Sequence, residues 1–405
     1  MRDPSANTKI LIYSHDTFGL GHLRRCRSIA HALVAGRKNL SVLILSGSPI
    51  IGSFDFRARV DFVRIPGVIK LRNGEYSPLS LHMDIGEVLE LRAEILHHTA
   101  RAFRPDMVIV DKEPLGLRGE MLETLRMQKD MGARLVLGLR DVLDDPVALA
   151  AEWQRKNVMP ALEELYDALW VYGLPQICEP LKGIQVSDSV REKMQYTGYL
   201  RRSLPEMGPA YSVCELTHDP YILVMTGGGG DGEELVDWVL RAYERQASLP
   251  HRALLVLGPF MAPRQREIFH RRIENLDNVE ALTFDARIEH LIDGAEGLVT
   301  MGGYNTFCEI LSFDKRALVV PREVPRREQW IRAAAAQDMG LIKMLSATEA
   351  ADTTAMIAAL EHLAQQPLPS QSCVPGLLDG LDRIGSLVSE QLPSLPVRAN
   401  EPTRS

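Results

Sequence analysis

The segment MGGYNTFCEI, residues 301–310, combines glycines, small polar side chains and one carboxylate in the order expected at an anion-binding helix start. Gly302 and Gly303 open a predicted helix, and the backbone N–H groups of its first turn have no acceptor within that helix. Asn305 and Thr306 place side-chain donors beside those N–H groups. We predict that Gly303, Asn305 and Thr306 bind a diphosphate here.

Glu309 extends this predicted site along the same helix. It follows Asn305 by four residues, which places it about 6 Å further along the axis and near the same face. A carboxylate there can accept both hydroxyls of a ribose whose diphosphate lies on the helix tip. Further along the chain, Glu328 and Gln329 precede a predicted helix and offer polar groups to sugar hydroxyls. The alternative is a purely structural turn in which Glu309 is a surface charge.

A second glycine-rich turn, GGGG at residues 227–230, also follows a predicted strand and leads into a helix. Such a run exposes backbone N–H groups without side-chain obstruction and can curl round an anion. We assign Gly228 and Gly229 to the same diphosphate. Gly227, Gly229 and Gly232 fit the GxGxxG spacing, but the next strand lacks the acidic end that dinucleotide-binding sites use.

The first turn of the chain, GLGHLRRC at residues 19–26, contains the strongest candidate for a base. His22 is predicted at a helix start, where the positive end of the helix dipole favours a neutral imidazole that can accept a proton. Gly21 beside it allows close approach of a phosphate. Arg24 occupies the position of the third glycine of a dinucleotide fingerprint, which argues against NAD. The alternative is a histidine that only caps the helix.

Two further acids follow strands in the same half. Asp111 ends the strand predicted at 106–110, and Asp16 lies two residues beyond the first strand. Either is a candidate general base, or a residue that only caps its loop. The long irregular segment at 66–84 is expected to shape an acceptor site, since loops of that length often carry binding residues.

The elements that position these turns repeat a strand–helix pattern twice, which is typical of parallel α/β sheets. The predicted strands lie at 9–14, 41–45, 61–65, 106–110, 134–139 and 168–173, and then at 221–226, 252–258, 278–284, 297–301 and 316–321. We predict two Rossmann-like, doubly wound α/β domains facing each other across a cleft. Ligands of such sheets bind where the strands end.

The linker between the two domains is predicted within residues 201–220, where proline, glycine and polar residues interrupt every periodic pattern. We expect an N-terminal domain at 1–205 and a C-terminal domain at 206–375. Residues 376–392 show helical spacing and are expected to pack back toward the N-terminal domain, followed by a disordered tail at 393–405.

Composition excludes several classes of function. The 405 residues carry a net charge of −7, which offers no broad basic surface for nucleic acid. No run reaches the ~20 apolar residues of a membrane-spanning helix, and the start lacks the pattern of a signal peptide. The five cysteines are scattered and include no CxxC pair, so we expect reduced thiols and a cytoplasmic protein.

These turns together resemble the GT-B nucleotide-sugar glycosyltransferases, in particular the MurG-like family 28. The resemblance rests on GLGH (19–22), GGGG (227–230), GGYNTFCE (302–309) and VPREVPRREQWIRA (320–333). The GLGHLRRC turn is also similar to the GxGHxxRC turn of PseG-type nucleotide-sugar hydrolases. The resemblance covers most of the chain.

The resemblance implies a role for each matching residue. The diphosphate would lie against Gly303, Asn305 and Thr306, the ribose against Glu309, and the sugar against Glu328 and Gln329. Phe284 and Ile288 occupy the segment that holds the base in this family, and His22 would lie near the anomeric carbon. Such enzymes generally need no metal or other cofactor, so none is expected.

Several reactions remain open. Transfer of a sugar from a nucleoside-diphosphate donor, UDP-linked, to a hydroxyl acceptor is the leading hypothesis. Hydrolysis of the same donor, epimerisation and non-catalytic binding of a nucleotide sugar are the alternatives. The acceptor is not identified by the sequence; a lipid-linked acceptor or a polysaccharide precursor fits, the former with peripheral contact at the inner face of a membrane.

Overall fold

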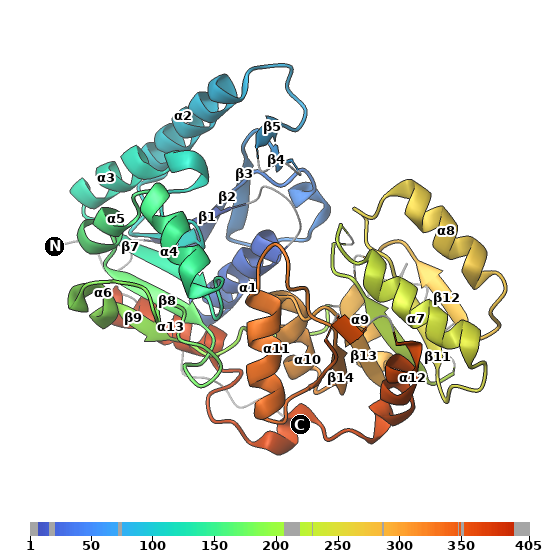
Figure 1. The fold of residues 1–405 in the computed structure, drawn as a ribbon. Helices are drawn as coiled ribbons and strands as arrows, with labels where there is room; N and C mark the ends of the chain where they lie inside the picture. The colour runs from blue at the N-terminus through green and yellow to red at the C-terminus, as the bar shows by residue number, and fades with distance from the viewer. Residues whose placement is uncertain are drawn as a thin grey trace. The chain divides into compact units, whose positions relative to one another are not determined.

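A computed structural model describes residues 7–15, 21–71, 75–205, 219–228, 230–285, 287–346, 348–349 and 352–392 (Figure 1). Contacts divide the chain into two compact units. The first covers Met1–Pro175, Glu179–Leu200 and Asp379–Ser405, and the second covers Gln176–Cys178 and Arg201–Leu378. The candidate residues Asp16, Gly19 and Gly229 lie outside the described residues, as do most of the predicted linker and the predicted tail at 393–405.

The first unit is built on a seven-stranded sheet in the order β3-β2-β1-β6-β7-β8-β9, and all its paired strands are parallel. The strands are β1 (Thr8–Ser14), β2 (Leu40–Ser46), β3 (Val60–Arg64), β6 (Met107–Asp111), β7 (Arg134–Arg140), β8 (Ala168–Tyr172) and β9 (Met194–Tyr196). The helices are α1 (Gly21–Gly36), α2 (Ile85–Phe103), α3 (Leu122–Asp130), α4 (Pro146–Arg155), α5 (Met159–Glu164), α6 (Asp188–Glu192) and α13 (Gly380–Gln391).

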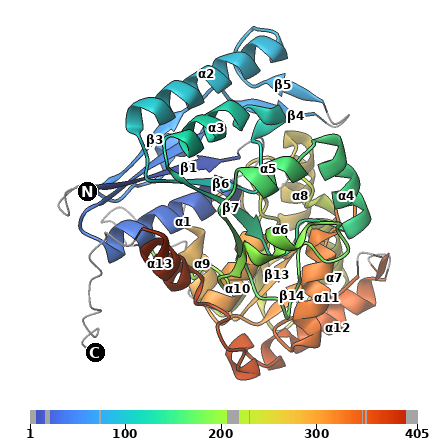
Figure 2. The ribbon, with the colours of Figure 1, turned by 90° about the vertical axis from the view of Figure 1, so that its left-hand side faces the viewer.

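The central strands of this sheet are buried on both faces because helices cover both. Every residue of β6 is buried, and β1 is buried except at Lys9, as expected for apolar strands of a parallel sheet. Figure 2 shows α2 and α3 on one side of the sheet and α1 and α13 on the other. Helix α1 turns Leu23, Cys26 and Ile29 toward the sheet, at the spacing of one helix face.

Helix α13 joins the first unit although it is the last helix of the chain that the structure describes. It packs against α1 (Figure 2), and Arg37 donates hydrogen bonds to the Gly385 carbonyl and the Ser389 hydroxyl. Gly380 lies so close to the backbone that an added Cβ would come within 2.6 Å of the Gly198 carbonyl oxygen. A glycine at the start of α13 is therefore needed for this packing.

The segment at 66–84 is more regular than the sequence suggested. It contains an antiparallel hairpin of β4 (Val68–Lys70) and β5 (Tyr76–Pro78). The strands are only three residues long, too short for an alternating pattern to be recognised. Likewise, the short edge strand β9 was not predicted.

The second unit contains a six-stranded sheet in the order β12-β11-β10-β13-β14-β15, also parallel throughout. The strands are β10 (Tyr221–Met225), β11 (Arg252–Val256), β12 (Val279–Leu282), β13 (Gly297–Thr300), β14 (Ala317–Val319) and β15 (Lys343–Met344). The helices are α7 (Glu233–Arg245), α8 (Pro263–Ile273), α9 (Ile288–Gly294), α10 (Tyr304–Ser312), α11 (Glu328–Asp338) and α12 (Thr353–His362). Figure 1 shows α10 and α11 on one side of this sheet and α7 and α12 on the other. The predicted fold class of two parallel α/β sheets is confirmed.

A buried ion pair between Arg92 and Glu120 links α2 to the loop after β6 and contacts Tyr13 of β1. Arg92 on α2 donates from Nε and Nη2 to the two oxygens of Glu120 at 2.7 and 2.6 Å, and both side chains are 1% exposed. The Tyr13 hydroxyl donates to Glu120 at 2.6 Å and accepts from the Leu117 amide. Burial, reinforced by Glu120, raises the pKa of Tyr13, so the hydroxyl keeps the proton that it donates.

This ion pair yields a stability prediction. Glu120→Gln leaves the Arg92 guanidinium buried without its counter-charge and should lower the free energy of unfolding by about 3–5 kcal/mol. Glu123→Gln is the matched control, because its partner Arg126 is 57% exposed and Glu123 itself 72% exposed; the expected loss is under about 1 kcal/mol. Urea unfolding of the full chain measures both, and equal losses would contradict the role given to Glu120.

Candidate functional site

Each sheet reverses its strand order at one central pair of strands. In the first unit this pair is β1 and β6, and in the second it is β10 and β13. Loops that leave such a pair run to opposite faces and open a space at the carboxyl ends of the strands, where doubly wound sheets bind ligands. The turns singled out from the sequence follow these strands in both units.

His22 and Asp111 form a direct contact in the first unit. His22 Nδ1 lies 2.5 Å from Asp111 Oδ2. Arg25 donates to the same carboxylate from Nε at 2.8 Å and from Nη2 at 2.7 Å. Because the carboxylate accepts the Nδ1 proton, the neutral ring of His22 keeps Nε2 as its acceptor. This is the arrangement in which a carboxylate orients a histidine as a base.

The charges around Asp111 fix its ionisation and that of His22. Burial raises the pKa of Asp111, but the charges of Arg25 and His22 outweigh it and hold the pKa well below its usual range. Burial is also the main cause that lowers the pKa of His22, with Arg25 and Lys112 acting in the same direction and Asp111 against it. The neutral His22 expected from its helix position therefore owes its state mainly to burial.

A buried imidazole, that of His15, lies beside the half-buried ring of His22. The ring of His15, just beyond β1, meets the ring of His22 edge-on at 5.7 Å between centroids. Burial lowers the pKa of His15 well below its usual range. Nearby, Glu113 pairs with Lys112 at 3.4 Å and with Lys156 at 2.7 Å. Cationic side chains thus border this edge of the first unit.

The start of α10 in the second unit has the backbone geometry of an anion site. Gly302 has φ 69°, and an added Cβ would lie 2.6 Å from a methyl group of Val319, so only glycine fits there. Gly303 is the N-cap, no side chain caps the helix, and its first turn holds no acidic residue. A Cβ on Gly303 would meet nothing within 4 Å. The backbone at this helix start can be approached closely.

Two buried arginines lie at the same helix start. Arg202 Nη2 donates to Asn305 Oδ1 at 2.9 Å. Arg332 Nη1 donates to the Gly302 carbonyl at 3.1 Å, and its guanidinium lies 5.7 Å from the centre of the Tyr304 ring. These cations add to the positive end of the helix dipole. A negatively charged group is the ligand that this combination favours.

The other predicted donor residues differ in exposure. Glu309 is 2% exposed, so it is not the surface charge of the alternative interpretation. Thr306 is half-buried in the first turn of α10, and Ile288 is half-buried at the start of α9. Phe284 is 47% exposed, as a ring available for stacking would be. Their roles in binding stay predictions.

Glu328 and Gln329 share one hydrogen-bond partner, Arg322, which the sequence did not single out. They lie in the first turn of α11, not before the helix as expected. Arg322 Nη2 donates to Glu328 Oε1 at 2.7 Å, and the Arg322 backbone N–H donates to Gln329 Oε1 at 2.9 Å. Arg322 Nη1 also donates to Asp231, which follows the glycine-rich turn after β10. Arg322 thereby links the turn before α11 to the glycine-rich turn before α7.

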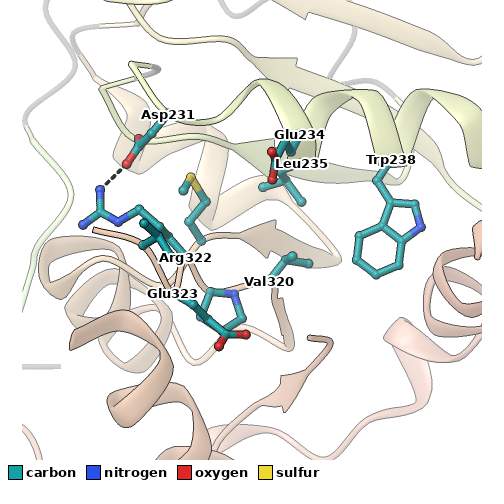
Figure 3. Close-up of a pocket in the computed structure, with 10 residues that line it drawn as sticks. Asp231, Glu234, Leu235, Trp238, Val320, Arg322 and Glu323 are labelled. Carbon is teal, nitrogen blue, oxygen red and sulfur yellow. Dashed lines mark hydrogen bonds and ion pairs between the residues drawn. The ribbon is translucent and has the colours of Figure 1, made fainter. Parts of the chain in front are cut away.

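A pocket of about 310 Å³ lies beside this contact (Figure 3). Leu235, Trp238 and Val320 form part of its apolar lining, and Asp231 and Arg322 lie at one side. Gly228, in the turn above α7, packs against Phe260, whose ring would lie 3.2 Å from an added Cβ. The glycine-rich turn thus has little room for a side chain at this position.

The pairing of His22 with Asp111 joins two residues that the sequence named separately. The participation of Arg25, Arg322, Asp231 and Arg202 was missed. Arg25 follows His22 by one helical turn, a spacing that places both on one face and that was available in the sequence. Arg322 and Asp231 are 91 residues apart, and no local pattern links them.

Comparisons with known proteins find a family match in part of the second unit and a relative that covers most of the chain. Residues 222–372 match the glycosyltransferase family 28 C-terminal domain. A relative from Methanosarcina mazei, described as an uncharacterized glycosyltransferase, is 25% identical over 337 residues, which span 81% of this chain and 83% of the relative.

Three solved structures share the fold across the whole chain. The glycotransferase of kitacinnamycin has a TM-score of 0.64 at 14% identity, covering 96% of this chain and 100% of that one. MurG of Acinetobacter baumannii has a TM-score of 0.58 at 12% identity, with 95% and 99% covered. A UDP-N-acetylglucosamine 2-epimerase has a TM-score of 0.60 at 13% identity, with 96% and 95% covered. The predicted GT-B architecture is confirmed.

Two features are absent from the described residues. These residues contain no group of three or more His, Cys, Asp or Glu side chains placed to hold a metal ion. They also contain no helix with the length and apolar character needed to cross a membrane. The expectation that no metal or cofactor is required stays a prediction.

The electrostatics of His22 can be tested by titration. Asp111→Asn removes the charge that raises the pKa of His22, so the pKa should fall further. Lys112→Gln removes a charge that lowers it, so the pKa should rise toward the ordinary value. NMR titration of the imidazole nitrogens in the full chain measures both shifts. Shifts of the same sign in the two variants would contradict this account of the site.

Proposed function

We propose that this chain, a glycosyltransferase of the GT-B type with a family 28 C-terminal domain, transfers a sugar from a UDP-linked donor to a hydroxyl acceptor. The observation that carries the proposal is the start of α10. No side chain caps this helix, its first turn holds no acidic residue, and Arg202 and Arg332 lie beside it; together these features favour a doubly charged diphosphate. The uridine part is supported by the similar fold of an epimerase named for a UDP-sugar.

The rest of the donor extends from this diphosphate. Glu309, further along α10, accepts the ribose hydroxyls, and the side chains of Phe284 and Ile288 contact the base. Glu328 and Gln329 at the start of α11 bind the sugar hydroxyls. The turn containing Gly228 and Gly229, together with Gly21 of the first unit, contributes backbone N–H groups to the phosphates.

The transfer step needs a base and a stabilised leaving group. His22 Nε2 takes the proton of the acceptor hydroxyl while that oxygen forms a bond to the anomeric carbon. The bond from this carbon to the diphosphate oxygen breaks, and its electron pair leaves with the nucleoside diphosphate. Attack opposite the leaving group inverts the anomeric centre. The donors at α10 stabilise the developing charge without a metal.

Asp111 acts in this scheme through His22. Its low pKa and its hydrogen bonds to Arg25 make it a poor proton acceptor. It holds the His22 ring in the tautomer that leaves Nε2 basic and stabilises the imidazolium that forms. Of the candidate bases that lie within the described residues, His22 is the base and Asp111 is a positioning residue.

The acceptor class is suggested by the surface around the β4–β5 hairpin. Leu71, Leu79, Leu81 and Met83 are large apolar side chains that are exposed there. Exposed apolar groups gathered on one segment often mark an interaction site. They support a lipid-linked acceptor, handled by a cytoplasmic protein in peripheral contact with a membrane. A soluble polysaccharide precursor would not need them.

Hydrolysis is the second candidate, because the GLGHLRRC turn that holds His22 is similar to that of nucleotide-sugar hydrolases. The reaction would use the same base with water in place of the acceptor. Assays with UDP-, GDP- and dTDP-sugars, with and without lipid-linked and polysaccharide acceptors, separate these functions. Release of nucleotide that requires an acceptor supports transfer, release without one supports hydrolysis, and binding without turnover supports a binding protein.

Donor binding can be tested at α10. Asn305→Asp places a negative charge at the helix start and should weaken UDP binding by at least about tenfold, or about 1.4 kcal/mol. Glu309→Gln keeps the volume of this buried side chain and should weaken binding by about 1–3 kcal/mol through its hydrogen bonds to ribose. Calorimetry with UDP measures both, and unchanged affinity in Glu309→Gln would remove the ribose assignment.

The role of His22 can be tested by kinetics. His22→Ala should leave UDP affinity unchanged and lower kcat about 10²–10⁴-fold, the usual contribution of a general base. Because the pKa of His22 lies below its ordinary value of 6.5, the wild-type kcat/KM should decline only as pH falls below that value, as the base becomes protonated. Full activity of His22→Ala would exclude it from the mechanism.

A further inference from the structure

We propose that Arg322 is a positioning residue that sets the orientation and charge of the donor-sugar residues Glu328 and Gln329. The inference rests on the proposed function. Arg322 belongs to the segment between β14 and α11, directly before the turn that leads to those residues. Arg322 contacts Glu328, Gln329 and Asp231 at the same time.

The contacts of Arg322 fix both sugar-binding side chains at once. Its guanidinium donates to Glu328 Oε1 at 2.7 Å, and its backbone N–H donates to Gln329 Oε1 at 2.9 Å. Each contact uses one oxygen of its partner. The second oxygen of Glu328 and the amide nitrogen of Gln329 are therefore the groups left to meet a sugar.

The polar atoms around Arg322 are incompletely paired. Glu328 Oε2 and Arg322 Nε are buried and have no hydrogen-bond partner in the structure. Leaving a buried polar group unpaired costs about 1–3 kcal/mol, more for charged groups, so such atoms mark positions where a ligand group is expected. A sugar hydroxyl both donates and accepts, and can pair with either atom.

The charge of Arg322 matters as well as its geometry. Asp231 and Glu328 would otherwise present two uncompensated carboxylates beside the turns assigned to a diphosphate. Arginine suits this place because its planar fork reaches two carboxylates at once, whereas the ammonium of lysine is a point charge. Its side chain is 25% exposed at the pocket in Figure 3, so it is not simply part of the core.

Calorimetry that compares UDP with UDP-sugars tests this role. Arg322→Gln should raise the Kd for UDP-glucose or UDP-N-acetylglucosamine, whichever binds the wild type, by about tenfold or more, which corresponds to the loss of a charge-assisted hydrogen-bond network. The Kd for UDP should change less than about twofold, because UDP lacks the transferred sugar that is proposed to contact Glu328. A purely structural role would weaken both ligands equally.

Three further variants sharpen the test. Arg322→Lys should restore part of the UDP-sugar affinity, and Asp231→Asn should have a smaller effect than Arg322→Gln because Arg322 keeps its bond to Glu328. Glu323→Gln removes a charge from the adjacent residue at the same pocket and should bind like the wild type.

The outcomes also separate this inference from the proposed function. Unchanged UDP-sugar affinity in Arg322→Gln, or equal loss of UDP and UDP-sugar affinity, overturns the role of Arg322 alone. A wild-type protein that binds neither UDP nor any of the nucleotide sugars overturns the proposed function, and the role of Arg322 with it.

Discussion

A carboxylate buried at the end of a strand has to be matched by positive charge, and this requirement organises the site of the first unit. Asp111 is the last residue of β6; Arg25 on α1 supplies the matching positive charge, and His22 on the same helix supplies a further hydrogen bond. These contacts hold the first turn of α1 against the end of β6 and leave Nε2 of His22 as its acceptor nitrogen. A single electrostatic constraint thus links the packing of a helix to the state of a base.

In the second unit, the charges at the start of α10 are arranged differently from those around Asp111. The start of α10 has two arginines beside it and no acid in its first turn, which makes the end of this helix positive. At α11 the acids are present, and Arg322 compensates them. One edge of this sheet therefore combines a positive helix start with carboxylates that an arginine compensates.

Much of this organisation is predictable from sequence because it is local. The β-branched runs predicted the central strands. The glycines predicted the turn at Gly302 and Gly303, where the backbone conformation requires glycine at Gly302. Long-range pairings were not predictable: Arg322 and Asp231 come from different βα turns, and only the fold brings them together. The main cause of the pKa shift of His22 was missed for the same reason, since burial depends on packing and not on neighbouring residues.

The isolated bridge between Leu200 and Asp379 has a topological consequence. The chain leaves the first unit after Leu200 and returns to it at Asp379, so apart from the short stretch Gln176–Cys178 the whole second unit is an insertion at one point of the first. An insertion whose ends meet can be exchanged as one piece without rethreading the host sheet. One continuous stretch of the gene therefore encodes nearly all of the second unit.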